Sequence, residues 1–173
     1  MSTVRHPAAL RLVHWITAAL VLSALAVGLS MVDDLSPLRH VALQMHKLTG
    51  LLVLVLTLLR IGVRLTTRAA PAPASLPPLQ RYIASASHVA LYALLLLVPT
   101  CGLAMQWAAG NPVVLPGGTV LPSLIAPDLA TYGALRQAHG VLAWSLLAVV
   151  LLHIAAALHH ALVRRDGLLR RML

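Results

Sequence analysis

The chain has 173 residues, of which 60% are hydrophobic and only 10% are charged. Because a soluble domain carries about a quarter charged residues, this composition excludes an ordinary soluble fold and predicts an integral membrane protein with one compact domain over residues 1–173. The net charge of +9 would favour a nucleic-acid partner in a soluble protein, but here the arginines flank apolar segments. We therefore expect a lipid bilayer, and no nucleic acid, as the partner of these charges.

Four apolar segments are long enough to cross a bilayer, and they predict an all-α bundle of four transmembrane helices. In chain order, the expected spans cover residues 12–32, 41–64, 85–107 and 135–164. Asp33, Asp34 and Pro37 break the chain after the first span, and a stretch rich in proline and alanine at 65–78 links the second span to the third. The third connection is the longest, and we expect its apolar part at 121–129 either to lie on the membrane surface or to cover a cofactor.

Lysine and arginine residues are distributed unevenly between the two ends of these spans. Ten lie at the end that includes both termini, namely Arg5, Arg11, Arg60, Arg64, Arg68, Arg81, Arg164, Arg165, Arg170 and Arg171. Only Arg39, Lys47 and Arg136 lie at the opposite end. Because cytoplasmic segments carry an excess of Lys and Arg, this asymmetry predicts that both termini are cytoplasmic.

Four histidines fall inside the predicted spans, where ionisable residues are rare and usually functional. His14 lies in the first span, His46 in the second, and His139 and His153 lie fourteen residues apart in the fourth. Fourteen residues return to nearly the same face of a helix and climb roughly 21 Å, most of the thickness of the hydrocarbon core. Imidazole commonly ligates haem iron, so this arrangement predicts two haems.

The alternative reading is a zinc or copper site built from the same histidines. A compact metal site would favour nearby carboxylates or thiols, and no acidic residue lies inside any predicted span. Cys101 is the only cysteine, which excludes a c-type haem attachment and a Cys-ligated iron–sulfur cluster. The predicted haems are therefore b-type, and a His-based metal-binding membrane protein remains the second alternative.

Depth in the membrane pairs the four histidines. With cytoplasmic termini, His46 and His139 share the outer level, whereas His14 and His153 share the inner level. One haem cannot bridge both levels, so these are the expected pairs of axial ligands to haem iron. Three glycines are candidates for places where a porphyrin approaches the backbone closely, with ordinary helix packing as the alternative: Gly28, Gly50 and Gly140.

Cations near each level are candidates for binding the anionic haem propionates, although they also suit a role in topology or snorkelling. The candidates are Arg11, Arg60 and Arg64 for the inner haem, and Arg136 and Lys47 for the outer haem. His88 opens the third span, where it either bonds a propionate or lies at the membrane interface. His159 and His160 follow His153, and they either lie at the interface, replace His153 as a ligand, or exchange protons with a quinone near the inner haem.

At this point the chain resembles the bacterial cytochrome b561 family over essentially its whole length. The matching residues are His14-Trp15, His46 with Gly50, His88 with Tyr92, Pro99 and Gly102, Gly110-Asn111-Pro112, His139, His153 and His159-His160. The resemblance implies a four-helix protein of the bacterial inner membrane with two b haems, in which the fourth helix serves both. It also implies electron exchange with the quinone pool.

For the short members of that family, the resemblance implies oxidation of superoxide to dioxygen at the periplasmic side and reduction of ubiquinone. The spacing of fourteen residues between two histidines is also similar to that in the cytochrome b subunits of membrane formate dehydrogenases and nickel–iron hydrogenases. The alternative function is therefore a membrane-anchor cytochrome b subunit that serves a partner redox subunit.

Overall fold

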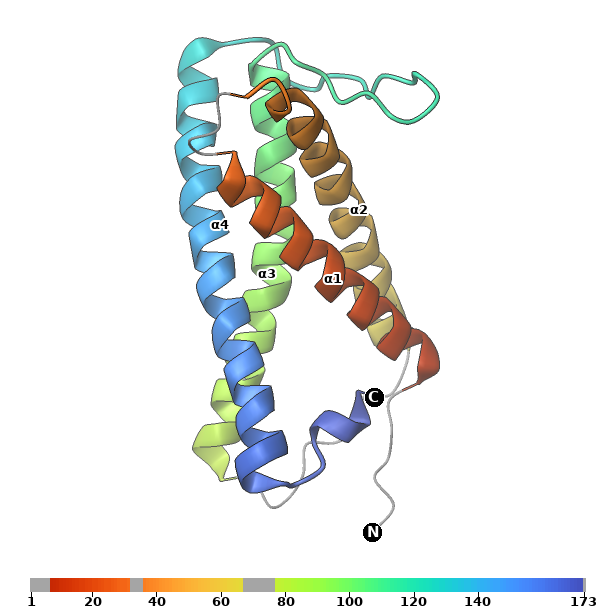
Figure 1. Cartoon of the computed structure of the whole chain (residues 1–173), viewed down its shortest axis with the longest axis vertical. Helices are drawn as coiled ribbons and strands as arrows, with labels where there is room; N and C mark the ends of the chain where they lie inside the picture. Colours follow the sequence, from red (N-terminus) through yellow and green to blue (C-terminus); the bar gives the residue numbers. More distant parts are fainter. Residues whose placement is uncertain (1–6, 32–35, 67–76, 173) are drawn as a thin grey trace.

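A computed structural model describes residues 7–31, 36–66 and 77–172. It contains four long helices: α1 at Ala8–Ser30, α2 at Arg39–Thr66, α3 at Pro78–Ala108 and α4 at Leu129–Leu158 (Figure 1). Two short elements follow, a π-helix η1 at His159–Arg164 and a 3-10 helix η2 at Leu169–Arg171. Each long helix has the length and hydropathy needed to cross a membrane, so the predicted multi-pass all-α bundle is confirmed.

The helices alternate in direction and give the bundle two distinct ends (Figure 1). The "termini end" holds the start of α1 and the end of α4, and the "loop end" holds the α1–α2 connection and the loop between α3 and α4. Neighbouring helices in the chain pack against each other, and α1 crosses the bundle obliquely. A residue near the start of α2 therefore faces the last turns of α1.

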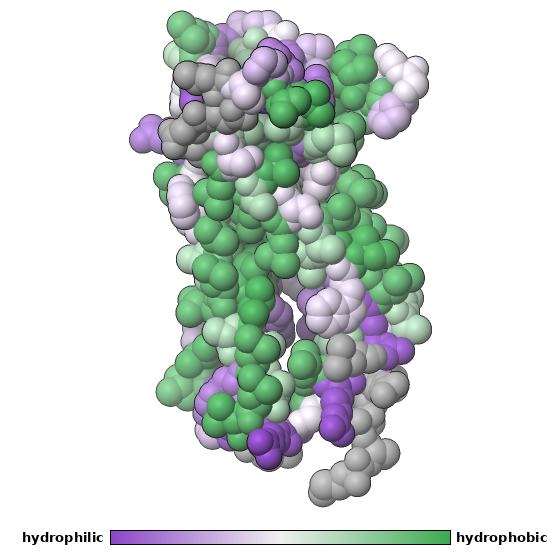
Figure 2. Space-filling model, in the orientation of Figure 1, coloured by the Kyte–Doolittle hydropathy of each residue, from purple (hydrophilic) through white to green (hydrophobic). Residues whose placement is uncertain are grey.

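One aliphatic side chain from each helix meets its counterparts in the middle of the bundle. This central layer consists of Val21, Val53, Leu95 and Leu146, all buried. The outer surface is also apolar, with hydrophilic residues gathered near the two ends of the bundle (Figure 2). Because lipid replaces water around such a protein, hydrophobic residues on both sides of a helix are expected here.

Several helix ends lie outside the predicted spans, namely the start of α1, both ends of α2 and of α3, and the start of α4. α4 begins six residues before its predicted start, since Asp128 caps it by accepting a hydrogen bond from the Thr131 N–H at 2.7 Å. This hydrogen bond lowers the pKa of Asp128. The expected charges and breakers Arg5, Asp33, Asp34 and Arg68 lie outside the described residues.

Candidate functional site

Two histidines face each other at the loop end, one from α2 and one from α4. The ring centroids of His46 and His139, the "loop-end pair", lie 6.2 Å apart with an interplanar angle of 83°. His46 Nδ1 lies 3.1 Å from the carbonyl oxygen of Ala24, and His139 Nδ1 lies 3.0 Å from that of Val98. A carbonyl only accepts, so each Nδ1 donates a proton and each Nε2 keeps its lone pair.

A second pair lies at the termini end. The ring centroids of His14 and His153, the "termini-end pair", are 6.5 Å apart with an interplanar angle of 74°. Arg60 of α2 donates a hydrogen bond from its guanidinium to His14 Nδ1 at 2.8 Å, and the same group lies over the Tyr92 ring at 5.6 Å from its centroid. A guanidinium cannot accept, so His14 carries its proton on Nε2 in this geometry, and this nitrogen would have to release the proton to bind iron.

The separation of each pair fits two imidazoles that bind one metal ion from opposite sides. An imidazole nitrogen binds a first-row metal at about 2.0–2.1 Å, which places the centroids of two opposed rings about 6.3 Å apart. The separations of 6.2 and 6.5 Å match this value at both ends. A metal-bound imidazole usually donates its other ring N–H to a carboxylate, a backbone carbonyl or water, so the loop-end pair fits haem iron in its donor chemistry as well.

A cavity between α2, α3 and α4 opens beside the loop-end pair. Apolar side chains and Gly50 line most of it, together with both imidazoles and Lys47. The Lys47 side chain is only 8% exposed, and its Nζ has no hydrogen-bond partner among the residues that the structure describes. A buried ammonium without a partner is costly, so this position suits an anionic group such as a haem propionate.

The three glycines predicted to admit a porphyrin differ in their surroundings. A Cβ atom on Gly50 or Gly140 would meet no heavy atom within 4 Å, which leaves room for a cofactor. A Cβ atom on Gly28 would lie 3.2 Å from Cε1 of His46. Gly28 thus makes room for an imidazole of the neighbouring helix.

The remaining predicted propionate contacts lie at different places. Arg11 is half-buried on α1, one turn before His14, whereas Arg64 is exposed in the last turn of α2 and Arg136 is exposed near the start of α4. His88 of α3 is exposed, and its ring centroid lies 5.7 Å from that of His153. The structure thus brings Arg60 and His88 to the termini-end pair.

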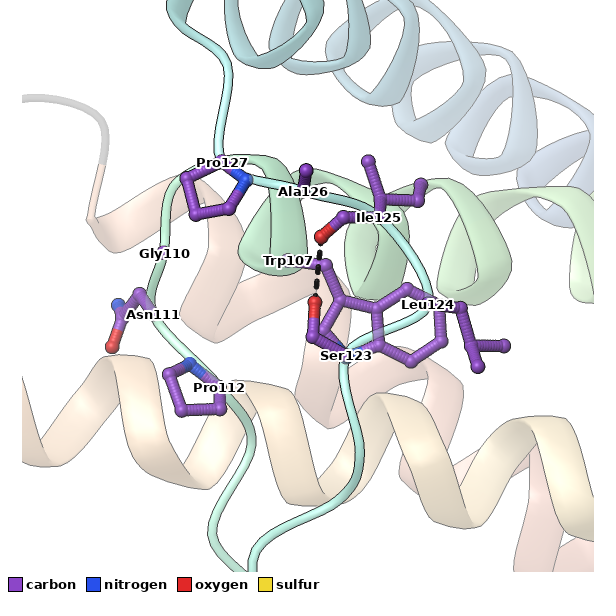
Figure 3. A pocket seen from close by; sticks show the side chains of 9 residues that line it. All are labelled: Trp107, Gly110, Asn111, Pro112, Ser123, Leu124, Ile125, Ala126 and Pro127. Carbon is purple, nitrogen blue, oxygen red and sulfur yellow. Dashed lines mark hydrogen bonds between the residues drawn. The ribbon is translucent and has the colours of Figure 1, made fainter.

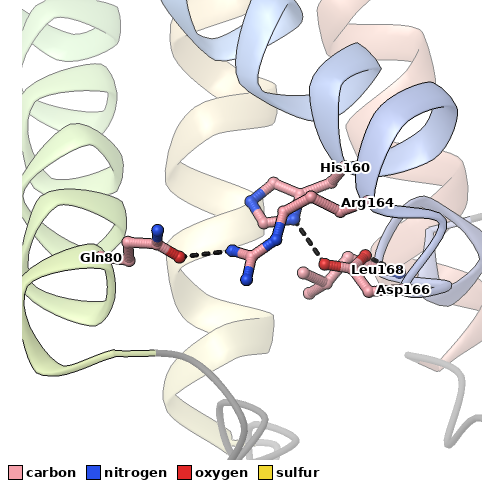
Figure 4. Close-up of polar contacts among 5 residues, drawn as sticks. All are labelled: Gln80, His160, Arg164, Asp166 and Leu168. Carbon is pink, nitrogen blue, oxygen red and sulfur yellow. Dashed lines mark hydrogen bonds and ion pairs between the residues drawn. The ribbon is translucent and has the colours of Figure 1, made fainter.

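The chain after α4 folds back at the termini end (Figure 4). Arg165 has a φ of 50° and Gly167 a φ of 74°, which reverse the backbone. His160 Nδ1 pairs with Asp166 Oδ2 at 2.6 Å, and Arg164 donates to Gln80 of α3 at 2.5 Å. Burial acts to raise the pKa of Asp166, but hydrogen bonds from His160 and the Leu168 N–H outweigh it, and the pKa is lowered.

This C-terminal segment also reaches α1. The Trp15 indole N–H donates to the Met172 carbonyl at 2.8 Å, and the Trp15 ring centroid lies 5.3 Å from that of His14. His159 is exposed, and its ring centroid lies 6.0 Å from that of His160. Figure 2 shows a hollow in the lower half of the molecule, at this termini end. Both predicted quinone residues thus lie at the termini end of the bundle.

The apolar part of the third connection lies over the end of α3 rather than over the histidines. Residues 123–127 and the ring of Trp107 line a cavity of about 490 Å³ (Figure 3). Ser123 donates to the Ile125 carbonyl at 2.7 Å and fixes one side of it. From the same connection, Val113 lines the cavity of the loop-end pair.

Sequence reasoning missed the backbone acceptors of the loop-end pair. Neither Ala24 nor Val98 carries a functional side chain, because only their carbonyl oxygens take part. The available signal was a glycine four residues after each of them, at Gly28 and Gly102. This signal acquires a meaning only when the packing of α1 on α2 and of α3 on α4 is known.

Comparison with known proteins identifies the family of the chain. The family model for prokaryotic cytochrome b561 matches residues 5–173. Cytochrome b561 homolog 2 of Escherichia coli (strain K12) is 32% identical over 165 residues, which cover 92% of this chain and 86% of that protein. Cytochrome b562 of Cereibacter sphaeroides is 32% identical over 171 residues, which cover 92% of this chain and 89% of that protein.

A more distant relative carries an activity in its name. Probable superoxide oxidase CybB of Yersinia pestis is 28% identical over 128 residues, which cover 74% of this chain and 72% of that protein. The family match extends over nearly the whole chain, and its four helices all suit a membrane. The chain therefore belongs to the prokaryotic cytochrome b561 family and is a membrane electron-transfer protein that binds haem b.

Proposed function

We propose that the chain holds two b haems, one between His46 and His139 and one between His14 and His153. The observation that carries this proposal is the presence of two opposed imidazole pairs, with centroids 6.2 and 6.5 Å apart, at the two ends of one membrane bundle. When bound, haem b supplies one-electron oxidation and reduction. Two imidazoles leave no open position on an iron, so the protein transfers electrons rather than binding oxygen.

The proposed orientation places both termini in the cytoplasm and the protein in the bacterial inner membrane, as the asymmetry of Lys and Arg indicates. The loop end is then periplasmic, where an electron donor meets the loop-end pair. Arg136 supplies exposed positive charge there, but Asp33, Asp34 and Asp128 belong to the same end, so the choice of an anionic donor rests on the relatives and not on charge. At the termini end, His159 and His160 lie where a quinone can take up protons as it is reduced.

We propose that the reaction oxidises superoxide and reduces ubiquinone. Two superoxide anions each lose one electron and leave as dioxygen, and ubiquinone takes both electrons with two protons to form ubiquinol. The similarity to the probable superoxide oxidase of Yersinia pestis supports this choice of donor. His160 is positioned to deliver a proton, because Asp166 holds its Nδ1 and leaves Nε2 available at the termini end.

The test begins with the purified, detergent-solubilised protein. Pyridine-haemochrome analysis is expected to give two haems b per chain, and superoxide is expected to reduce them before electrons pass to a ubiquinone analogue. A protein without protoporphyrin, prepared from cells supplied with haem precursors, would overturn the two-haem proposal. Slow reduction by superoxide together with co-purification of a large redox partner would instead support a membrane-anchor subunit.

A further inference from the structure

Both imidazoles of the loop-end pair are held in the same way, although they stand on different helices. His46 of α2 meets α1 at the Ala24 carbonyl oxygen, 3.1 Å from Nδ1. His139 of α4 meets α3 at the Val98 carbonyl oxygen, 3.0 Å from Nδ1. In each case, the residue four positions after the acceptor, one helical turn further on, is a glycine.

A side chain at either glycine would press against an imidazole of the loop-end pair. A Cβ atom on Gly102 would lie 3.0 Å from Cε1 and 3.2 Å from Nδ1 of His139. A Cβ atom on Gly28 would lie 3.2 Å from Cε1 and 3.6 Å from Nδ1 of His46. Contacts of about 3.0–3.2 Å are shorter than the optimal carbon–carbon separation of about 3.5–4.0 Å, so each ring would have to move.

Other helical glycines do not share this property. A Cβ atom on Gly62 of α2 would meet nothing within 4 Å, and the same holds for Gly50 and Gly140. The close contact is therefore specific to the two places where an imidazole bonds to the neighbouring backbone. Ordinary close packing of helices would bring the glycine against backbone or aliphatic atoms, whereas both contacts here are to histidine rings.

We propose that Gly28 and Gly102 are positioning residues that set the reduction potential at the loop end. Each lets an imidazole lie against the adjacent helix, where its Nδ1–H donates to a fixed backbone carbonyl. This hydrogen bond makes the other ring nitrogen a better electron donor to a metal, which favours the oxidised state of that metal. The inference rests on the proposed ligand role of the loop-end pair.

The predicted effect is confined to one end of the protein. At the termini end, His14 Nδ1 accepts a hydrogen bond from Arg60 instead of donating one to a backbone oxygen. Displacing His46 or His139 therefore weakens donation at the loop end and leaves the termini-end pair unchanged. The expected direction is a higher midpoint potential at the loop end.

The experiment compares Gly28→Ala, Gly102→Ala and the double variant with the wild type by redox titration of the detergent-solubilised full-length protein. In Gly102→Ala, we expect the reduction equilibrium of one haem to shift about tenfold toward the reduced form, or about 59 mV for one electron. Gly28→Ala, with its longer contact, is expected to shift the same haem less. The matched control is Gly62→Ala, which adds the same methyl group to a helix in open space and should shift neither haem.

A second measurement reports the hydrogen bonds directly. Nitrogen-15 spectra of histidine rings, recorded on the reduced protein, are expected to show protonated Nδ1 in His46 and His139 of the wild type. The His139 signal should change in Gly102→Ala and the His46 signal in Gly28→Ala. These signals exist whether or not haem is present, so failure of the two-haem proposal is distinguishable from failure of this one. If both alanine variants kept the ring signals and the midpoint potentials of the wild type, the proposed role of the glycines would be overturned. Gly28→Ala introduces the longer contact, so it still tests the proposal if Gly102→Ala does not fold.

Discussion

The two histidine pairs are similar in spacing but differ in what holds them. At the loop end, both rings bond to backbone carbonyls, at Ala24 and Val98. At the termini end, His14 bonds to the side chain of Arg60. A helix backbone is already fixed by its own hydrogen bonds, whereas ordering an arginine side chain costs up to about 2 kcal/mol of rotamer entropy. The loop end is thus the preorganised site, and the termini end is the adjustable one.

The adjustable end also has more polar neighbours. His88 lies within ring-contact distance of His153, and Arg60 packs on Tyr92 as well as on His14. The C-terminal segment joins this end through the Trp15 N–H and the Met172 carbonyl. Such a setting suits a site where a reactant arrives and leaves with protons, because several side chains can change partners there.

Removing a ligand imidazole is expected to produce the largest effect and to test whether the two ends are independent. His46→Ala and His139→Ala should each lose the same haem, about half of the total, and His14→Ala and His153→Ala should each lose the other. Absorption spectra and redox titration identify which haem remains. The pairing would be wrong if His46→Ala and His153→Ala removed the same haem.

Arg60→Leu should affect only the termini end. Loss of the guanidinium removes a positive charge beside His14, so the termini-end haem should become harder to reduce by about tenfold, or about 59 mV for one electron. Redox titration measures the shift, and Arg64→Leu, four residues later and exposed, is the matched control. An equal shift at the loop end would contradict the separation of the two sites.

Lys47→Met should affect only the loop end, and less strongly. The ammonium makes no hydrogen bond to either loop-end ring. Its removal is therefore expected to shift the reduction equilibrium of the loop-end haem only about threefold toward the oxidised form. In the haem-free protein, the thermal unfolding temperature of the variant should not fall, because an unpartnered buried charge is replaced by an apolar chain. A large loss of stability would show that Lys47 has a structural partner instead.

Acidification should loosen the C-terminal segment at the termini end. The folded-state pKa of Asp166 lies below its unfolded value of about 3.9, so its contribution to stability is present above that value and is lost as the pH falls through the folded pKa. Hydrogen exchange of residues 159–172, corrected for its intrinsic pH dependence, should accelerate below about pH 4. Asp166→Asn should exchange faster at neutral pH, by an amount equivalent to about 0.2–1 kcal/mol. If neither the lower pH nor Asp166→Asn accelerated the hydrogen exchange of this segment, other contacts would hold it in place.

The features that follow from regular geometry were predictable from the sequence. The length of each apolar segment gave the four helices, and the spacing between His139 and His153 placed one histidine at each end of α4. Helix ends were less predictable, because Asp128 begins α4 well before its continuous apolar part. Whether the four histidines bind iron stays a prediction.

Contacts that depend on the crossing of two helices were not predictable. Gly28 was predicted as a place where a porphyrin approaches the backbone, but the oblique course of α1 brings it against His46. The carbonyl acceptors are invisible in a sequence because every residue has one. The contact of Arg60 with His14 also depends on which face of α2 meets α1.

The central layer of Val21, Val53, Leu95 and Leu146 has a consequence for energy conservation. Between Lys47 and Arg60, and between His139 and His153, the chain has no ionisable residue. The buried Thr57 hydroxyl at this level donates to its own helix at Val53, 2.7 Å away. These two helices therefore provide no relay along which a proton could hop from one side to the other. A proton that crossed the bundle would have to follow a route other than α2 or α4.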